Sequence, residues 1–189
     1  WRVRVACRRP DLAFFLQPLG RVGQVVAVQA NVRVADSVAG ALQGADAVVN
    51  LVGVLAEGGR QSFEAVHGFG AAAIGKAATA AGIRNVVHVS AIGASAESPA
   101  AYARTKARGE AAIREAAPDT IIFRPSVIFG PEDGFFNRFA AMARIMPVLP
   151  LIGADTKFQP VFVGDVATAI ADALDGKAKA GTTYELGGP

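Results

Sequence analysis

The sequence is short of cysteine, of clustered charge and of long apolar runs, and each shortage excludes a class of protein. Its single cysteine, Cys7, cannot form an internal disulfide, and no Cys/His cluster has metal-ligand spacing, so we expect a cytoplasmic protein without a bound metal. No uninterrupted apolar run approaches the roughly 18 residues needed to cross a bilayer, which predicts no transmembrane segment. The formal charge of +3 is spread along the chain without a Lys/Arg block, so nucleic acid is not an expected partner.

Short apolar strands alternate with helical segments along the 189 residues, a length that suits one domain with one large core. Strands are expected at residues 1–7, 24–29, 45–53, 85–90, 120–124 and 182–186. Helices are expected at residues 11–19, 37–42, 63–81, 102–117, 135–145 and 165–174. Ser37 or Asp36 would cap the second helix and Asp165 the last. Apolar strands separated by helices predict a parallel sheet covered on both faces, so the fold class is α/β, a single doubly wound domain over residues 1–189.

Tyr102 and Lys106 stand four residues apart in a helical pattern that follows the strand at residues 85–90. They would lie on one helix face, where the ammonium would favour the ionised phenol and lower its pKa. A phenol with a lowered pKa can exchange a proton with a substrate oxygen. Lys106 could instead hold the sugar hydroxyls of a cofactor, and both roles suit the carboxyl end of a strand in a parallel sheet.

Residues 130–160 differ in character from the rest of the chain because large apolar side chains gather between glycines and prolines. A helix over residues 135–145 would carry a broad apolar face. Its members, with one residue beyond the helix, are Phe135, Phe136, Phe139, Met142, Ile145 and Met146. Such a face is core, a lid over an apolar pocket or a contact for a partner, and we predict a lid-like or partner-facing insertion at residues 130–160.

Six motifs, in this order, are similar to those of the extended and atypical short-chain dehydrogenase/reductases, a family that includes NAD-dependent epimerases and dehydratases. They lie at residues 50–53, 89–90, 102–106, 124–131, 161–167 and 184–189. Within the family the chain most resembles the accessory NAD(P)H-binding subunits of respiratory complex I and their bacterial relatives, through residues 16–23, 124–133, 136–140 and 157–161. The resemblance implies a Rossmann-like fold with a small substrate- or partner-side region near the C-terminus.

The resemblance also implies that Trp1 lies just before the second strand of the nucleotide fold. We therefore expect the first strand and a Gly-rich loop, of the form Gly-x-x-Gly-x-x-Gly, upstream of Trp1. That loop would receive the pyrophosphate of a nicotinamide dinucleotide.

By the same resemblance, Arg8 and Arg9 end a strand where an acidic residue would accept hydrogen bonds from a ribose. Two guanidinium groups favour a 2′-phosphate, so NADP(H) is preferred, with NAD(H) as the alternative; the simpler interpretation is that both are solvated charges. The remaining contacts implied are Asn31 and Val32 at the adenine, Asn50, Leu51, Val52 and Gly53 at the adenosine ribose and phosphates, Val89, Tyr102 and Lys106 towards the nicotinamide ribose, and Pro125, Ser126 and Val127 at the nicotinamide ring.

Two functions stay open. In the first, which we favour, the protein is a binding or structural subunit in which Tyr102 and Lys106 hold the ribose, with complex I as partner and a peripheral place on the inner membrane. In the second it is an oxidoreductase, epimerase or dehydratase acting on a quinone- or lipid-like substrate, with Tyr102 as acid/base. Ser90 would then hold the substrate oxygen, although Ile92 stands where the extended enzymes carry that hydroxyl. His67 occupies the place of a common helix Asn, and a lone His on an Ala-rich helix is often only packed.

Overall fold

The computed structural model describes residues 1–146 and 157–189. Its strands are β1 (Val3–Cys7), β2 (Val25–Gln29), β3 (Ala47–Asn50), β4 (Asn85–Val89), β5 (Ile121–Pro125), β6 (Ile128–Phe129), β7 (Val161–Phe162) and β8 (Thr183–Leu186). Its α-helices are α1 (Ala35–Leu42), α2 (Phe69–Ala80), α3 (Ala101–Ala116), α4 (Phe136–Ala143) and α5 (Val163–Leu174). A 3-10 helix, η1 (Pro10–Leu19), and a single π-helical turn, η2 (Glu64–Gly68), complete the set.

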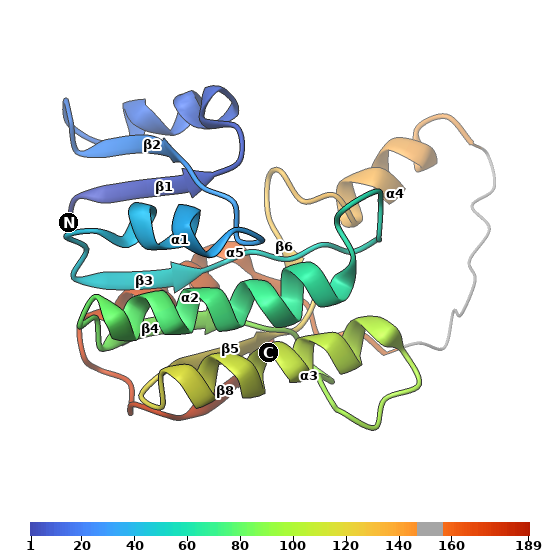
Figure 1. The fold of residues 1–189 in the computed structure, drawn as a ribbon. Helices are drawn as coiled ribbons and strands as arrows, with labels where there is room; N and C mark the ends of the chain where they lie inside the picture. The colour runs from blue at the N-terminus through green and yellow to red at the C-terminus, as the bar shows by residue number, and fades with distance from the viewer. Residues whose placement is uncertain (147–156) are drawn as a thin grey trace.

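Every strand pairing is parallel, which confirms the expected α/β class. Four strands form the main sheet in the order β3-β4-β5-β8, while β1 pairs with β2 and β6 with β7. Figure 1 shows the β1–β2 pair beyond β3, with η1 packed against it. In the part of the chain that the structure describes, β1 and β3 are not hydrogen-bonded to each other, so the strands fall into separate sheets on either side of this gap.

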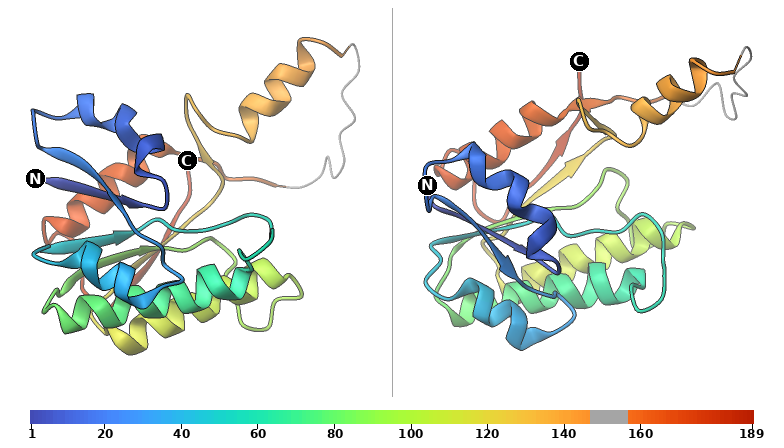
Figure 2. Two further views of the ribbon diagram at one scale, coloured as in Figure 1. Left: turned by 45° about the horizontal axis from the view of Figure 1, so that its top comes forward. Right: turned by 90° about the horizontal axis from the view of Figure 1, so that it is seen from above.

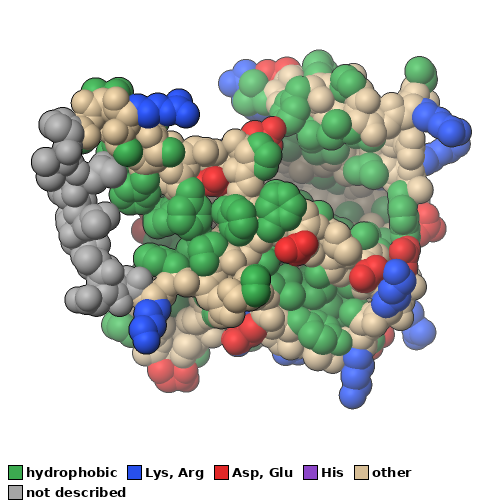
Figure 3. All heavy atoms as spheres, turned by 180° about the vertical axis from the view of Figure 1, so that it is seen from behind, with side chains coloured by type: hydrophobic (Ala, Val, Ile, Leu, Met, Phe, Trp, Pro, Cys, Tyr) green, Lys and Arg blue, Asp and Glu red, His purple; other side chains and the backbone are tan. Residues whose placement is uncertain are grey.

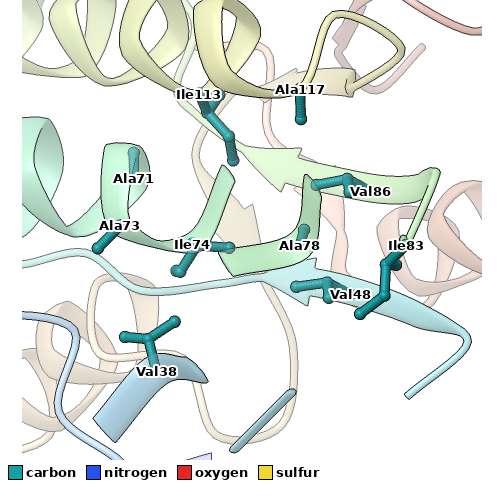
Figure 4. Close-up of a cluster of buried hydrophobic side chains, with 10 residues drawn as sticks. All are labelled: Val38, Val48, Ala71, Ala73, Ile74, Ala78, Ile83, Val86, Ile113 and Ala117. Atoms are coloured by element: carbon teal, nitrogen blue, oxygen red, sulfur yellow. The ribbon is translucent and has the colours of Figure 1, made fainter. Parts of the chain in front are cut away.

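Helices cover the main sheet on both faces. On one face, side chains from α1, α2 and α3 meet those of β3 and β4, and Figure 4 shows Val48, Ile74, Ala78, Val86 and Ile113 pointing toward one another. On the other face, α5 packs on β4 and β5 in a second buried cluster. The alternation along β4 assigns successive residues to opposite faces.

Two helix caps predicted from the sequence are wrong. The helices begin two residues earlier than expected, after Val34 and Phe162, and no side chain caps either one. Ser37 instead accepts a hydrogen bond from the backbone N–H of Asn31 at 3.0 Å, which fixes the turn after β2. Asp165 is exposed in the first turn of α5, where a negative charge interacts favourably with the helix dipole.

The predicted insertion at residues 130–160 contains α4, and its residues 147–156 lie outside the described residues. Figures 1 and 2 show α4 standing away from the sheet and its covering helices. No residue of α4 is buried, so the core interpretation of its apolar face does not apply. Among the described residues, the helices are too short or too polar to cross a membrane.

Candidate functional site

A cavity of about 340 Å³ lies between the β1–β2 pair and β3. Six residues predicted as cofactor contacts line it: Arg8, Asn31, Val32, Asn50, Val52 and Gly53. Their positions at the ends of β1, β2 and β3 bring together residues separated by up to 45 positions in sequence. Carboxyl ends of parallel strands meet at one edge, which is where open α/β sheets bind ligands.

Two of the contacts predicted for the adenosine half, Arg9 and Leu51, do not line this cavity, and neither do the six predicted towards the nicotinamide: Val89, Tyr102, Lys106, Pro125, Ser126 and Val127. Arg9 forms an ion pair with Asp11 at 2.8 Å, and both side chains are more than half exposed. Leu51 is 66% exposed. In contrast, Arg33 lines the cavity although the sequence did not single it out. The sequence feature that could have identified Arg33 is its place as a third arginine close to a strand end, directly after Asn31 and Val32.

Asn50 shapes the turn at the end of β3 with both the nitrogen and the oxygen of its side-chain amide. The side-chain nitrogen lies 2.9 Å from Nδ1 of His88, and the oxygen accepts a hydrogen bond from the backbone N–H of Val52 at 3.0 Å. Asn50 is 3% exposed. Its side chain is therefore used within the protein, where it holds the backbone of residues 50–52 in place.

Lys106 is 5% exposed and projects from α3 to the end of β4, where Nζ donates a hydrogen bond to the carbonyl oxygen of Val89 at 3.1 Å. A Cβ built on Gly53 would lie 3.5 Å from this nitrogen, so the glycine backbone and the ammonium are neighbours. Burial lowers the pKa of Lys106, and the negative charge of Glu110 opposes that shift. The amine has two further donor positions for a ligand.

Tyr102 is half-buried on the same helix, next to two rings. Its ring meets those of His67 and Phe63 edge to face, with centroids 5.4 Å and 5.9 Å apart. Burial raises the pKa of Tyr102, so the prediction that Lys106 lowers it is wrong. The phenol is neutral at physiological pH and offers an O–H donor.

His67 connects three parts of the site, which the sequence did not indicate. Its Nε2 accepts the backbone N–H of Val54 at 3.1 Å, and its Nδ1 lies 3.0 Å from the hydroxyl of Thr105. Thr105 in turn donates to the carbonyl oxygen of Tyr102, so Nδ1 carries the proton and the ring is neutral. Burial and the nearby Lys106 charge lower the pKa of His67 to about 4. The ring thus fixes the loop after β3 against α3.

Ser90 follows β4 and is 4% exposed, and its hydroxyl has no hydrogen-bond partner among the described residues. Ile92, at the position of the expected hydroxyl, is 47% exposed and donates its backbone N–H to the carbonyl oxygen of Pro125 at 3.0 Å. The N–H of Ser126 donates to Leu186. The strip at residues 125–127 is therefore held from both sides, while the Ser90 hydroxyl keeps its donor and acceptor capacity for a ligand.

Arg124 has a structural role. Its guanidinium forms two hydrogen bonds with the buried carboxylate of Glu110, at 2.7 and 2.9 Å, and lies 3.5 Å from Glu185. This ion pair joins α3 to β5.

Outside residues 147–156, no group of His, Cys, Asp and Glu side chains has the arrangement of a metal site.

Two family models and several curated relatives match this chain. A family model described as NAD(P)H-binding matches residues 2–140, and one described as the RmlD substrate binding domain matches residues 93–188. The chain is 41% identical over 177 residues to NADH dehydrogenase (ubiquinone) 1 alpha subcomplex subunit 9, mitochondrial, of Arabidopsis thaliana, which covers 92% of this chain and 44% of that protein. It is 32% identical over 170 residues to a ceramide reductase of Caulobacter vibrioides, covering 90% of this chain and 52% of the relative.

This chain spans about half the length of these curated relatives. Among solved structures, a double mutant of the dTDP-glucose 4,6-dehydratase from Streptomyces venezuelae with NAD bound matches all of this chain and 67% of that one, with a TM-score of 0.80 and 25% identity. A wide-type short-chain dehydrogenase/reductase from Veillonella parvula in complex with NADP shares the fold alone, with a TM-score of 0.68 and 18% identity over 100% of this chain and 83% of that one.

Proposed function

The chain belongs to the NAD(P)H-binding family, as a short-chain dehydrogenase/reductase-like member, and from that premise we propose that it holds its dinucleotide across the ends of β1, β3 and β4. The observation that carries the proposal is Lys106, a buried amine at the Val89 carbonyl and beside the Gly53 backbone. Burying an amine costs free energy unless its donors are used, and a ribose offers hydroxyl acceptors. The orphaned hydroxyl of Ser90 fits the same ligand as a second polar contact.

The adenosine half of the dinucleotide would lie at the mouth of the cavity between β1 and β3, beside Arg8, Asn31 and Val32 at the carboxyl ends of β1 and β2. We propose that a further parallel strand lies between the facing edges of β1 and β3 and carries a Gly-rich turn for the pyrophosphate. Support comes from the two edges, which face one cavity and are not hydrogen-bonded to each other. Such a strand would join both parts of the sheet.

NADP(H) is the proposed form of the cofactor. Arg9 pairs with Asp11, but Arg8 lines the cavity and so does Arg33, whose Nη1 donates to the carbonyl oxygen of Arg60 at 3.0 Å. Arg8 and the remaining donors of Arg33 are available to a 2′-phosphate. The variant Arg8→Ser should weaken NADPH binding about tenfold or more while leaving NADH binding within about twofold, because hydrogen bonds to charged groups contribute about 1.5–3 kcal/mol. Titration of the full-length protein with each nucleotide, followed by fluorescence, measures both affinities. Equal losses for the two nucleotides would contradict the assignment.

The role that these residues support best is that of a binding subunit, comparable with the accessory subunits of mitochondrial NADH dehydrogenase named among the relatives. Membership of such an assembly would place the protein peripherally on a membrane. Tyr102, whose pKa burial raises, is a poor base, and Ile92 replaces the expected hydroxyl. Both features weaken proton transfer more than they weaken ribose binding.

An oxidoreductase acting on a lipid-like ketone or a quinone is the second candidate, favoured by the ceramide reductase relative. When bound, NAD(P)H would supply a hydride to the carbonyl carbon of the substrate. Tyr102 would give its phenolic proton to the carbonyl oxygen, and Ser90 would orient that oxygen. Burial keeps the phenol protonated before the hydride moves, but the raised pKa also makes it a weaker proton donor.

One experiment separates the two candidates. Full-length protein is purified, tested for co-purified NADPH, and the bound nicotinamide fluorescence is followed after long-chain ketones or quinones are added. The binding role predicts retained fluorescence and co-migration with a respiratory complex. Consumption of NADPH that disappears in Tyr102→Phe, with the nucleotide still bound, would establish the oxidoreductase instead. Failure to bind either nucleotide would refute both.

A further inference from the structure

Two charged side chains of α3, Lys106 and Glu110, point into the protein. Charges are otherwise common on the surface, and Figure 3 shows basic and acidic side chains interspersed over one face of the molecule. Lys106 and Glu110 are only 5% and 6% exposed, and both belong to the buried face of α3. Charged side chains are almost never buried to this extent unless a charge of the opposite sign is close.

Glu110 binds a cation that it shares with a second carboxylate. Arg124 on β5 donates two hydrogen bonds to Glu110, at 2.7 and 2.9 Å, and the same guanidinium lies 3.5 Å from Glu185 on β8. Residues 124 and 185 are partners in the β5–β8 pairing, so the register of the sheet holds this arrangement. Together the three side chains carry one excess negative charge, because one guanidinium faces two carboxylates.

The ammonium of Lys106 supplies the balancing positive charge. Positions 106 and 110 are one helix turn apart on the buried face of α3, so the amine and the carboxylate are neighbours. The amine donates to the carbonyl oxygen of Val89, and one neutral acceptor does not offset the burial of a full charge. A carboxylate nearby contributes to that offset. Accordingly, burial lowers the pKa of Lys106 and the charge of Glu110 raises it.

The other groups that face Lys106 keep one charge state between pH 7 and pH 9. Burial lowers the pKa of His67 on η2 to about 4 and that of His88 on β4 to about 3, so both rings are neutral in this range. Burial raises the pKa of Tyr102, so the phenol keeps its proton. The guanidinium on β5 stays charged, since the carboxylate that it binds raises its pKa. That carboxylate is therefore the group that determines whether the amine stays charged.

We propose that Glu110 is a positioning residue for the nicotinamide dinucleotide, acting through Lys106 by keeping its amine an ammonium at the end of β4. The inference rests on the proposed function, in which this amine binds the ribose. A charged donor forms shorter and stronger hydrogen bonds than a neutral one, so the charge of the amine contributes to affinity. Arg124 holds the carboxylate in place. The ion pair between α3 and β5 thus serves ligand binding as well as the attachment of the helix to the sheet.

Two measurements on the full-length protein at several pH values test the inference. One is titration with NADPH followed by fluorescence, and the other is the carbon-13 NMR signal of the Lys106 Cε, assigned by its loss in Lys106→Met. Glu110→Gln removes the negative charge and keeps the size of the side chain. Wild-type Lys106 should be an ammonium at pH 8 and should lose its proton at a lower pH in Glu110→Gln. The fall in NADPH affinity from pH 7 to pH 9 should be about five- to tenfold larger in the variant, because charge-assisted hydrogen bonds are lost.

A second substitution separates the charge of Glu110 from the structure of the ion pair. Arg124→Gln breaks the same pair but removes a positive charge, so it should not lower the pH at which Lys106 loses its proton. A purely structural ion pair would instead give both variants the same loss of affinity at every pH. Glu115→Gln, which neutralises an exposed carboxylate of α3, is the matched control and should behave as the wild type does.

The NMR titration needs no nucleotide, so it distinguishes failure of this inference from failure of the proposed function. Normal NADPH binding with an unchanged titration of Lys106 in Glu110→Gln would overturn the inference alone. An equal shift in Arg124→Gln would do the same. Absence of NADPH binding would refute the proposed function and, with it, the role of Glu110. Should thermal unfolding show that Glu110→Gln does not fold, the wild-type signal decides, because an amine already neutral at pH 8 contradicts the inference.

Discussion

Lys106 is the residue on which the proposed site most depends, because its ammonium is buried and has one hydrogen bond to the protein. We predict that Lys106→Met weakens NADPH binding about 10- to 100-fold, since a hydrogen bond to a charged group contributes about 1.5–3 kcal/mol. Stability should change by less than about 1 kcal/mol, because relief of the buried charge opposes loss of the bond to Val89. Nucleotide titration and urea unfolding measure the two quantities.

A suitable control for this prediction is Lys76→Met, which alters an exposed lysine of α2 and should leave both quantities unchanged. A purely structural lysine would give the opposite pattern in Lys106→Met. Stability would fall while the affinity for NADPH stayed the same, and that result would remove Lys106 from the binding site.

The sequence could predict those parts of the site that depend on local spacing. Tyr102 and Lys106 are four residues apart on one helix, so their common face follows from helix geometry. The contacts of His67 with Val54 and Thr105 span 13 and 38 residues, and no local pattern indicates them. The pKa of Tyr102 was predicted in the wrong direction because helix spacing gives no information about burial, which dominates here.

At the scale of elements, η2 and α3 approach so closely that only a glycine fits at position 109. A Cβ built there would collide with the carbonyl oxygen of His67. Gly109→Ala should therefore destabilise the protein by about 1–3 kcal/mol and weaken NADPH binding, because it displaces the helix that carries Tyr102 and Lys106. Urea unfolding and nucleotide titration test both expectations.

Gly40, inside α1, provides the matched comparison. A Cβ built at Gly40 meets no atom within 4 Å, so Gly40→Ala should stabilise the protein by up to about 1 kcal/mol through helix propensity alone. If both substitutions had the same effect, the close approach of η2 and α3 would not explain the glycine at position 109.

Element positions were predictable wherever hydrophobic periodicity was strong. The strands of the main sheet, the helix α3 and the continuous helical stretch formed by η2 and α2 lie within three residues of their expected bounds, because apolar and Ala-rich runs determine them. The two-residue strands β6 and β7 were not predicted, since their pairing depends on contacts between distant segments. The expected caps at Ser37 and Asp165 failed because a capping residue type is also common inside the first turn.

At the scale of the whole molecule, the division of the sheet determines where a ligand can enter. The main sheet has buried clusters on both faces, whereas the β1–β2 pair meets it across the cavity. A dinucleotide bound at the mouth of this cavity would contact both parts of the sheet, so its binding should hold the two parts together. Sequence patterns identify each strand but not its neighbour in the sheet, so periodicity alone could not locate the division.

Global stability should depend on pH through the two histidines. The pKa of His67 is lowered to about 4, and burial, aided by the charges of Lys106 and His67, lowers that of His88 to about 3. Both values lie below the ordinary 6.5, so below that pH the unfolded chain binds more protons than the native protein. The stabilisation is complete above about pH 6.5 and is lost as the pH falls towards 4 for His67 and 3 for His88.

The expected size of this pH dependence follows from the number of extra protons that the unfolded chain binds. Between about pH 6 and pH 4.5, the two histidines together should raise the unfolding constant roughly 100-fold per pH unit, or tenfold for each. His67→Asn retains a polar side chain but removes one titrating group, so its dependence should be weaker by about tenfold per pH unit. Carboxylates titrate equally in both proteins and cancel in the difference. Urea unfolding at several pH values gives that difference directly, and parallel pH profiles for the two proteins would show that His67 is not held neutral by the fold.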